Sequence, residues 1–147
     1  MADAPSVETL RHIYETSKVI AVVGASMDPD KRAHIVPAYL REQGYRIIPV
    51  NPRYDQLFGE RCYPSLEDIP EAVDVVDVFR PSDEAPAIAR AAAAIGARVL
   101  WLQVGITSEE AARIAAEANM IFVSDMCMAV THAGHGFGPA PKADRSD

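Results

Sequence analysis

A glycine-containing turn near the N-terminus carries the residues best suited to ligand chemistry. Gly24, Ala25 and Ser26 directly follow 19–23, a run of apolar and mostly β-branched residues. Such a run, bounded by turn residues, is typical of a strand buried on both faces of a parallel sheet. A glycine at its end lets the backbone turn sharply and approach a ligand, and a following helix would offer free N–H groups to an anion. The spacing therefore predicts a phosphate-bearing ligand over residues 24–26.

Cations follow this turn and the next predicted strand. Lys31 and Arg32 lie in the loop after the turn, where they could neutralise a pyrophosphate, and Pro52 and Arg53 come just after the run 46–50. NAD sites place an Asp or Glu at the latter position, about 20 residues past the glycines, to bind the ribose hydroxyls. This sequence has no such carboxylate, and it also lacks the full G-x-G-x-x-G fingerprint. Because a guanidinium suits a phosphate, the residues favour NADP or coenzyme A over NAD.

Further candidate contacts lie where two later strands are expected to end. Phe79, Arg80 and Pro81 close the apolar run 73–79 or follow it directly, so they could line the adenine or ribose of a nucleotide. Gln103 and Gly105 lie at the end of the run 99–104 and could approach the middle or tail of the same ligand.

Groups suited to catalysis are few. Cys127 lies near a predicted strand end with His132 a few residues further on, but nothing in the sequence orients them as nucleophile and base. There is no HExxH motif, no pair of carboxylates on a helix face and no G-x-S-x-G elbow. We therefore expect no catalytic residue and no metal site, and we interpret Cys127 as a thiol near the ligand site.

The composition is that of one acidic globular domain. The chain has 147 residues, of which 49% are hydrophobic and 24% charged, and a net charge of −7. The negative charge argues against a nucleic-acid or anionic-membrane partner. No apolar run approaches the ~20 residues of a membrane span, no secretory signal is recognisable, and the two cysteines favour free thiols in a reducing compartment. We expect a cytoplasmic protein with a small-molecule ligand.

Alternating strands and helices must position these residues. Apolar runs predict strands at 19–23, 46–50, 73–79, 99–104 and 120–124, and helical spacing predicts helices near 6–16, 33–43, 82–95 and 107–118. This alternation is typical of an α/β, Rossmann-like fold with a doubly wound five-stranded parallel sheet. We expect strand order 3-2-1-4-5, with the ligand at the switch point between strands 1 and 4. Residues 1–132 would form the domain and residues 133–147 a flexible C-terminal tail.

Four stretches resemble, in their order and spacing, the YccU-like family of stand-alone CoA-binding proteins. They are 22–26, 44–52, 73–80 and 100–106, and the resemblance extends over about residues 7–132. These proteins are similar to the CoA-binding domain of the succinyl-CoA synthetase α-subunit. The resemblance implies a Rossmann-like domain that binds coenzyme A, so it favours CoA over NADP.

The resemblance also implies roles for individual residues. Gly24, Ala25 and Ser26 would face the CoA phosphates, Pro52 and Arg53 would lie near the adenosine 3′-phosphate, and Phe79, Arg80 and Pro81 would line the adenine. The family tends to read Asp-Arg-Cys where this chain has Asp125-Met126-Cys127, so a charged role for that loop does not carry over. The synthetase has its phosphorylated histidine in a different domain, so ligase activity does not carry over either.

Three functions stay open on the sequence. The first is a protein that binds CoA or an acyl-CoA without catalytic machinery of its own, as a sensor, carrier or accessory module. The second is an enzyme, either an NADP-binding oxidoreductase or a CoA-dependent transferase completed by a partner subunit. The third is a dimerising scaffold whose ligand site has decayed. A homodimer is allowed by the alanine-rich third helix and by an apolar sheet edge.

Overall fold

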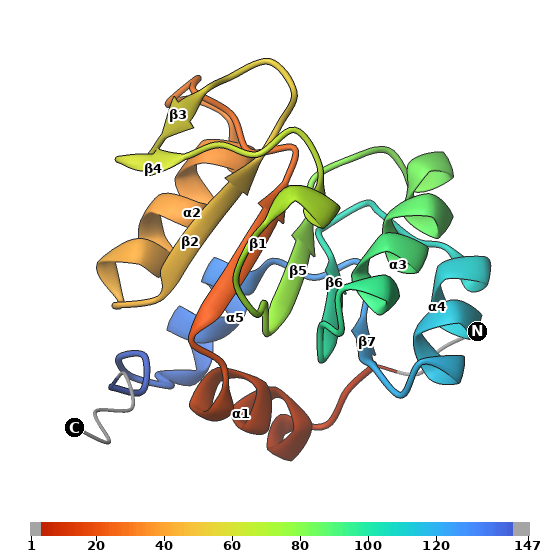
Figure 1. Cartoon of the computed structure of the whole chain (residues 1–147). Helices are drawn as coiled ribbons and strands as arrows, with labels where there is room; N and C mark the ends of the chain where they lie inside the picture. Colours follow the sequence, from red (N-terminus) through yellow and green to blue (C-terminus); the bar gives the residue numbers. More distant parts are fainter. Residues whose placement is uncertain (1–3, 143–147) are drawn as a thin grey trace.

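Five parallel strands form the centre of the computed structural model, which describes residues 4–142 (Figure 1). They are β1 (Val19–Val23), β2 (Arg46–Val50), β5 (Val75–Val78), β6 (Val99–Leu102) and β7 (Ile121–Val123). Every residue of β5 and β6 is buried, which explains why these runs are apolar throughout instead of alternating with polar residues. The expected α/β, Rossmann-like fold with a five-stranded parallel sheet is confirmed.

Helices cover both faces of the sheet. Helices α1 (Val7–Thr16), α2 (Arg32–Glu42) and α5 (Met128–His135) pack on one face. Helices α3 (Ala85–Ala94) and α4 (Glu109–Glu117) pack on the other, together with the 3₁₀ turn η1 (Leu66–Asp68). A second 3₁₀ turn, η2 (Ser82–Glu84), leads into α3, and a small hairpin joins β3 (Gln56–Leu57) to β4 (Glu60–Arg61). None of the helices within residues 4–142 combines the length and hydrophobicity that a membrane crossing requires.

The expected strand order, 3-2-1-4-5, is wrong. Hydrogen-bonded neighbours run β2-β1-β5-β6-β7, which is 2-1-3-4-5 when the five core strands are numbered along the chain. Asp74 reinforces the observed order, because its Oδ2 accepts hydrogen bonds from the backbone N–H groups of Lys18 (2.8 Å) and Val19 (3.0 Å). These bonds fix the start of β5 beside the start of β1. The topological switch point, where ligands bind in doubly wound sheets, therefore lies between β1 and β5.

The chain beyond residue 132 makes defined contacts in the part that the structure describes. Helix α5 continues to His135, across the expected domain boundary, and the Phe137 ring packs 5.1 Å from the ring of Tyr14. Further on, the backbone N–H of Ala140 donates to the carbonyl of Gln43 (2.8 Å). The expected tail at 133–147 is thus packed against the domain as far as Ala140, and its residues 143–147 lie outside the described part of the chain.

Candidate functional site

The turn after β1 approaches the segment after β5 very closely. Gly24 has φ of 91°, and its N–H donates to the carbonyl of Val50 (2.9 Å). A Cβ atom at Gly24 would lie 2.8 Å from the carbonyl oxygen of Phe79 and 3.0 Å from Cδ of Arg80. Both the positive φ and the close approach require glycine at this position. Gly24 therefore brings the β1 turn and the β5 exit together at the switch point.

Hydrogen bonds within the loop fix the two residues after Gly24. The Asn51 side chain donates to the carbonyl of Ala25 (2.9 Å), and Ser26 Oγ accepts from the N–H of Asp28 (3.0 Å). The ring nitrogen Nδ1 of His34 lies 2.7 Å from the Ser26 carbonyl. Ala25 is fully buried and Ser26 is only 9% exposed. Ala25 and Ser26 thus shape the turn, and a ligand would reach mainly their backbone.

The N-terminus of α2 is open toward the same region. Lys31 is its N-cap residue and supplies no side-chain cap. No hydrogen bond joins the backbone N–H groups of Arg32 or Ala33 to any described residue. Unpaired N–H groups at a helix start carry the positive end of the helix dipole and suit an anion.

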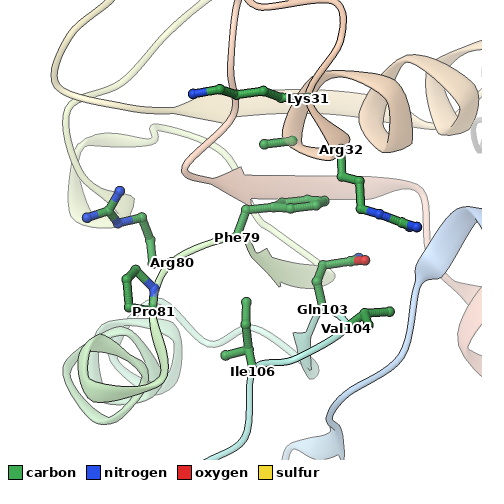
Figure 2. Close-up of a pocket in the computed structure, with 9 residues that line it drawn as sticks. Lys31, Arg32, Phe79, Arg80, Pro81, Gln103, Val104 and Ile106 are labelled. Atoms are coloured by element: carbon green, nitrogen blue, oxygen red, sulfur yellow. The ribbon is translucent and has the colours of Figure 1, made fainter.

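A pocket of about 390 Å³ lies beside this helix start. Figure 2 shows Phe79 in its centre, Lys31 and Arg32 above, Arg80 and Pro81 to one side, Gln103 and Val104 to the other, and Ile106 below. Ala33 completes the lining. The structure thus brings together six of the predicted site residues: Lys31, Arg32, Phe79, Arg80, Pro81 and Gln103. Ala33, Val104 and Ile106 were not predicted from the sequence. Val104 is 54% exposed, which is unusual for an apolar residue that directly follows a buried strand.

Two loops that line this pocket are tied to each other. Ile106 N–H donates to the Gln103 carbonyl (3.0 Å), and Thr107 N–H donates to Ser82 Oγ (3.1 Å). Gly105, a predicted site residue, has φ of 83°, and its N–H donates to Asp125 Oδ1 (2.7 Å). Gly105 thus shapes the turn between Val104 and Ile106.

The pocket has an excess of positive charge. Arg80 pairs with Glu84 through two hydrogen bonds of 2.7 Å and 3.1 Å, which raise the pKa of its guanidinium. Lys31 and Arg32 make no ion pair with a described residue. Two cations without a counter-ion among residues 4–142 therefore line the pocket, in a chain whose net charge is −7.

The two predicted residues after β2 lie apart from this pocket. Pro52 borders a second pocket of about 480 Å³, whose other lining residues are Tyr54, Asp55, Gln56, Arg61, Cys62 and Pro64. The Arg53 backbone N–H donates to Asn51 Oδ1 (2.9 Å), and its exposed guanidinium makes no hydrogen bond to a described residue. Since Asn51 also bonds to Ala25, Arg53 remains linked to the glycine turn.

Cys127 does not line either pocket. It is 5% exposed and packs in the core on the α1 and α5 side of the sheet. Both ring nitrogens of His132 are engaged, Nδ1 with the Tyr39 hydroxyl (2.8 Å) and Nε2 with the Gly138 carbonyl (2.6 Å). His132 is therefore not free to act as a base for Cys127. Within residues 4–142, no group of three or more His, Cys, Asp and Glu side chains could hold a metal ion.

One charged residue behind the pocket was not predicted. Asp77 lies in the middle of β5 and is fully buried, and its Oδ1 accepts a 2.6 Å hydrogen bond from Nε2 of Gln103. Burial raises its pKa to about 7, and the bond from Gln103 partly opposes this shift. The signal for this residue was a carboxylate in the interior of the otherwise apolar run 75–79.

Comparison with known proteins agrees with this geometry. The sequence model of a family described as CoA binding domain matches residues 18–133, which include all five core strands and both pockets. The uncharacterized protein YneT of Bacillus subtilis (strain 168) is 39% identical over 129 residues, covering 88% of this chain and 96% of YneT. A solved structure from Thermus thermophilus, cell-free ID.343, superimposes with a TM-score of 0.84 at 42% identity, over 88% of this chain and 98% of that one.

A larger enzyme matches over part of the chain. The ADP-forming acetate–CoA ligase of Methanocaldococcus jannaschii is 31% identical over 71 residues, which are 48% of this chain and 10% of the ligase. The similarity to that ligase is thus confined to a small segment of its length.

Proposed function

The chain belongs to the CoA-binding domain family, and from this premise we propose that it binds coenzyme A or an acyl-CoA in the pocket beside the Gly24 turn. The observation that carries the proposal is the meeting at the switch point of a helix start without a side-chain cap, two cations that pair with no residue of the described chain, and an apolar wall. CoA has the matching parts, namely a pyrophosphate, an adenosine 3′-phosphate, and a long arm of apolar and amide groups.

The anionic part of CoA would lie at the start of α2. A pyrophosphate there would meet the free N–H groups of Arg32 and Ala33 and the side chains of Lys31 and Arg32. A helix N-terminus and unpaired cations act together on a phosphate, because both supply charge-assisted hydrogen bonds. Gly24 supports this placement, since a side chain there would displace the neighbouring backbone.

The less polar part of CoA would lie against the opposite wall. Phe79, Pro81, Val104 and Ile106 offer apolar surface, and Gln103 is the polar residue among them. Pockets for small molecules usually combine such a wall with a few placed polar groups. The adenosine 3′-phosphate would face Arg53, where NAD sites have a carboxylate instead.

We infer a role as a sensor, carrier or accessory module. The groups that line the pocket are cations, apolar side chains and one amide, and they include no paired nucleophile and base. In the acetate–CoA ligase the matching segment is a tenth of the length. A domain of this type could therefore supply CoA to chemistry that a partner subunit performs.

Replacing Arg53 tests the assignment of the 3′-phosphate. We expect Arg53→Ala to weaken CoA binding about ten-fold, which corresponds to the loss of one charged hydrogen bond. Binding of dephospho-CoA, which lacks the 3′-phosphate, should weaken less than about two-fold. Arg32→Ala should weaken both ligands alike, because both contain the pyrophosphate. Titration calorimetry measures these affinities, and Arg113→Ala, on the exposed side of α4, controls for the loss of one positive charge. Equal losses for the two ligands in Arg53→Ala would refute the assignment.

A further inference from the structure

Asp77 is an acidic side chain whose charged form is destabilised by burial. The buried polar or charged residues of the described chain are Ser17, Ser26, Asp77, Gln103, Thr131 and His132, so no buried lysine or arginine accompanies it. Its Oδ2 atom is fully buried and has no hydrogen-bond partner among the described residues. A buried carboxylate without a counter-ion destabilises a fold. The one partner that the structure gives this carboxyl group is Gln103.

Gln103 connects this buried carboxyl group to the pocket. It follows β6, is 4% exposed, and lines the pocket beside Val104 and Ile106. Its Nε2 donates to Asp77, and no described residue donates to its Oε1. Among the described residues, the fully buried side-chain N and O atoms without a partner are Ser17 Oγ and Asp77 Oδ2. Gln103 Oε1 also lacks a partner but is not one of them, so it is not fully buried and remains in contact with the pocket space.

We propose that Asp77 is a positioning residue, which holds the Gln103 amide group so that Oε1 faces the pocket as an acceptor for an N–H donor of the ligand. A carboxylate only accepts hydrogen bonds, so it selects the NH₂ end of the amide and turns the oxygen end away. The 2.6 Å separation fits a charge-assisted bond. Gln103 untethered would present either end to the pocket.

The identity of the donor rests on the proposed function: it is a secondary amide N–H of the pantetheine arm of CoA. That arm contains two such amides, whereas adenosine 3′,5′-bisphosphate has the adenosine end of CoA without the arm. The carboxylate at Asp77 would therefore determine affinity for the arm and leave the adenosine end unaffected.

The orientation of the amide should depend on pH. A protonated Asp77 becomes a hydrogen-bond donor and accepts either orientation of Gln103, so binding of the arm weakens as pH falls through about 7. The titratable groups packed near Asp77 on this face include Tyr14 of α1, whose pKa burial and Asp77 raise, Tyr39 of α2, Tyr45 before β2, Cys127, and His132 of α5. Lys31 and Arg32, at the start of α2, line the same pocket as Gln103.

Four proteins test the proposal by calorimetry with CoA and with adenosine 3′,5′-bisphosphate at pH 8 and pH 6: wild type, Gln103→Ala, Asp77→Leu and Asp77→Asn. At pH 8, we expect Gln103→Ala and Asp77→Leu to weaken CoA about ten-fold and the bisphosphate less than two-fold. Asp77→Asn, like a protonated Asp77, both accepts and donates hydrogen bonds, so it allows either orientation of Gln103 and should weaken CoA by up to about three-fold, as far as wild type weakens at pH 6. Between pH 8 and pH 6, wild type should lose more CoA affinity than Asp77→Asn, while the titration of the phosphates is common to both.

A second measurement reports on the amide without any ligand. The side-chain ¹H–¹⁵N signals of Gln103 should shift with a midpoint near pH 7 in wild type and should be flat in Asp77→Asn. Equal losses for CoA and the bisphosphate in Gln103→Ala, or a wild-type amide signal without this titration, would overturn the proposal. Failure of wild type to bind CoA would instead overturn the proposed function, while the amide titration would still report on the tether.

Discussion

Gly24→Ala is expected to cost the fold about 2–4 kcal/mol and to weaken CoA binding at least ten-fold. The new Cβ would lie 2.8 Å from the carbonyl oxygen of Phe79, and the backbone there has φ of 91°. Because that neighbour is main chain, relief requires the β1 turn and the β5 exit to move apart. The movement would displace Phe79 and Arg80, which line the pocket. Chemical denaturation and calorimetry with CoA measure the two effects.

Gly96→Ala is the matched control for this substitution. Gly96 follows α3 with φ of 77°, but a Cβ added there would meet nothing within 4 Å. It should therefore cost only the backbone strain, about 1–2 kcal/mol, and leave CoA affinity unchanged. If Gly24→Ala were no more destabilised than Gly96→Ala, the close approach at the switch point would have no energetic consequence.

Asp77→Asn is expected to stabilise the protein at pH 8 by up to about 4 kcal/mol and to have little effect at pH 4. The pKa of Asp77 rises from 3.8 to about 7 on folding because the carboxyl group is buried. Between these values the folded state binds more protons than the unfolded state, so wild-type stability falls as pH rises from about 4 to about 7. Asparagine removes the charge and keeps the shape, so it removes this loss.

Urea denaturation of both proteins from pH 4 to pH 8 measures the difference. Other groups, such as Glu71 with its pKa lowered by Arg46, titrate equally in the two proteins and cancel. Asp83→Asn, at an exposed position in η2, should show no such trend. A difference between Asp77→Asn and wild type that is constant across this pH range would mean that the Asp77 pKa is the same in the folded and unfolded states. Together with the tether to Gln103, the expected trend would mean that the protein retains a costly charge for its function.

Most of the pocket could be predicted because all parallel strands of such a sheet end at the same edge. Arg80, Pro81 and Gln103 come just after apolar runs, so the fold class alone places them together. Lys31 and Arg32 were expected beside the ligand because they lie in the loop just after the Gly24 turn. The apolar lining residues Val104 and Ile106 had no such signal, because an apolar residue beside a strand end normally continues the core.

The strand order could not be read from the pattern of strands and helices. Orders 3-2-1-4-5 and 2-1-3-4-5 both contain parallel strands joined by crossovers, and they differ in where the chain goes between residues 51 and 74. That connection contains no long helix to indicate the face it crosses. The order depends on the pairing of β1 with β5, to which the hydrogen bonds from the Lys18 and Val19 backbone to Asp74 contribute, and these are contacts between residues far apart in sequence.

The chemistry of individual side chains was the least predictable part. Cys127 was expected near the ligand because it follows a strand end, yet the chain turns there into α5 and buries the thiol. Asp77 was not predicted near the ligand because it lies in the middle of a strand, yet it is connected to the pocket through its hydrogen bond with Gln103. Both outcomes depend on which way a side chain points, and this is set by tertiary packing.

Calorimetric titration of the wild-type protein with CoA, dephospho-CoA, NADP and NAD tests the central claim most directly. We expect saturable binding of one CoA per chain, weaker binding of dephospho-CoA, and affinities for NADP and NAD at least about 100-fold below that for CoA, a difference of about 2.7 kcal/mol. Binding of NADP that is tighter than binding of CoA, or the absence of CoA binding, would contradict the account.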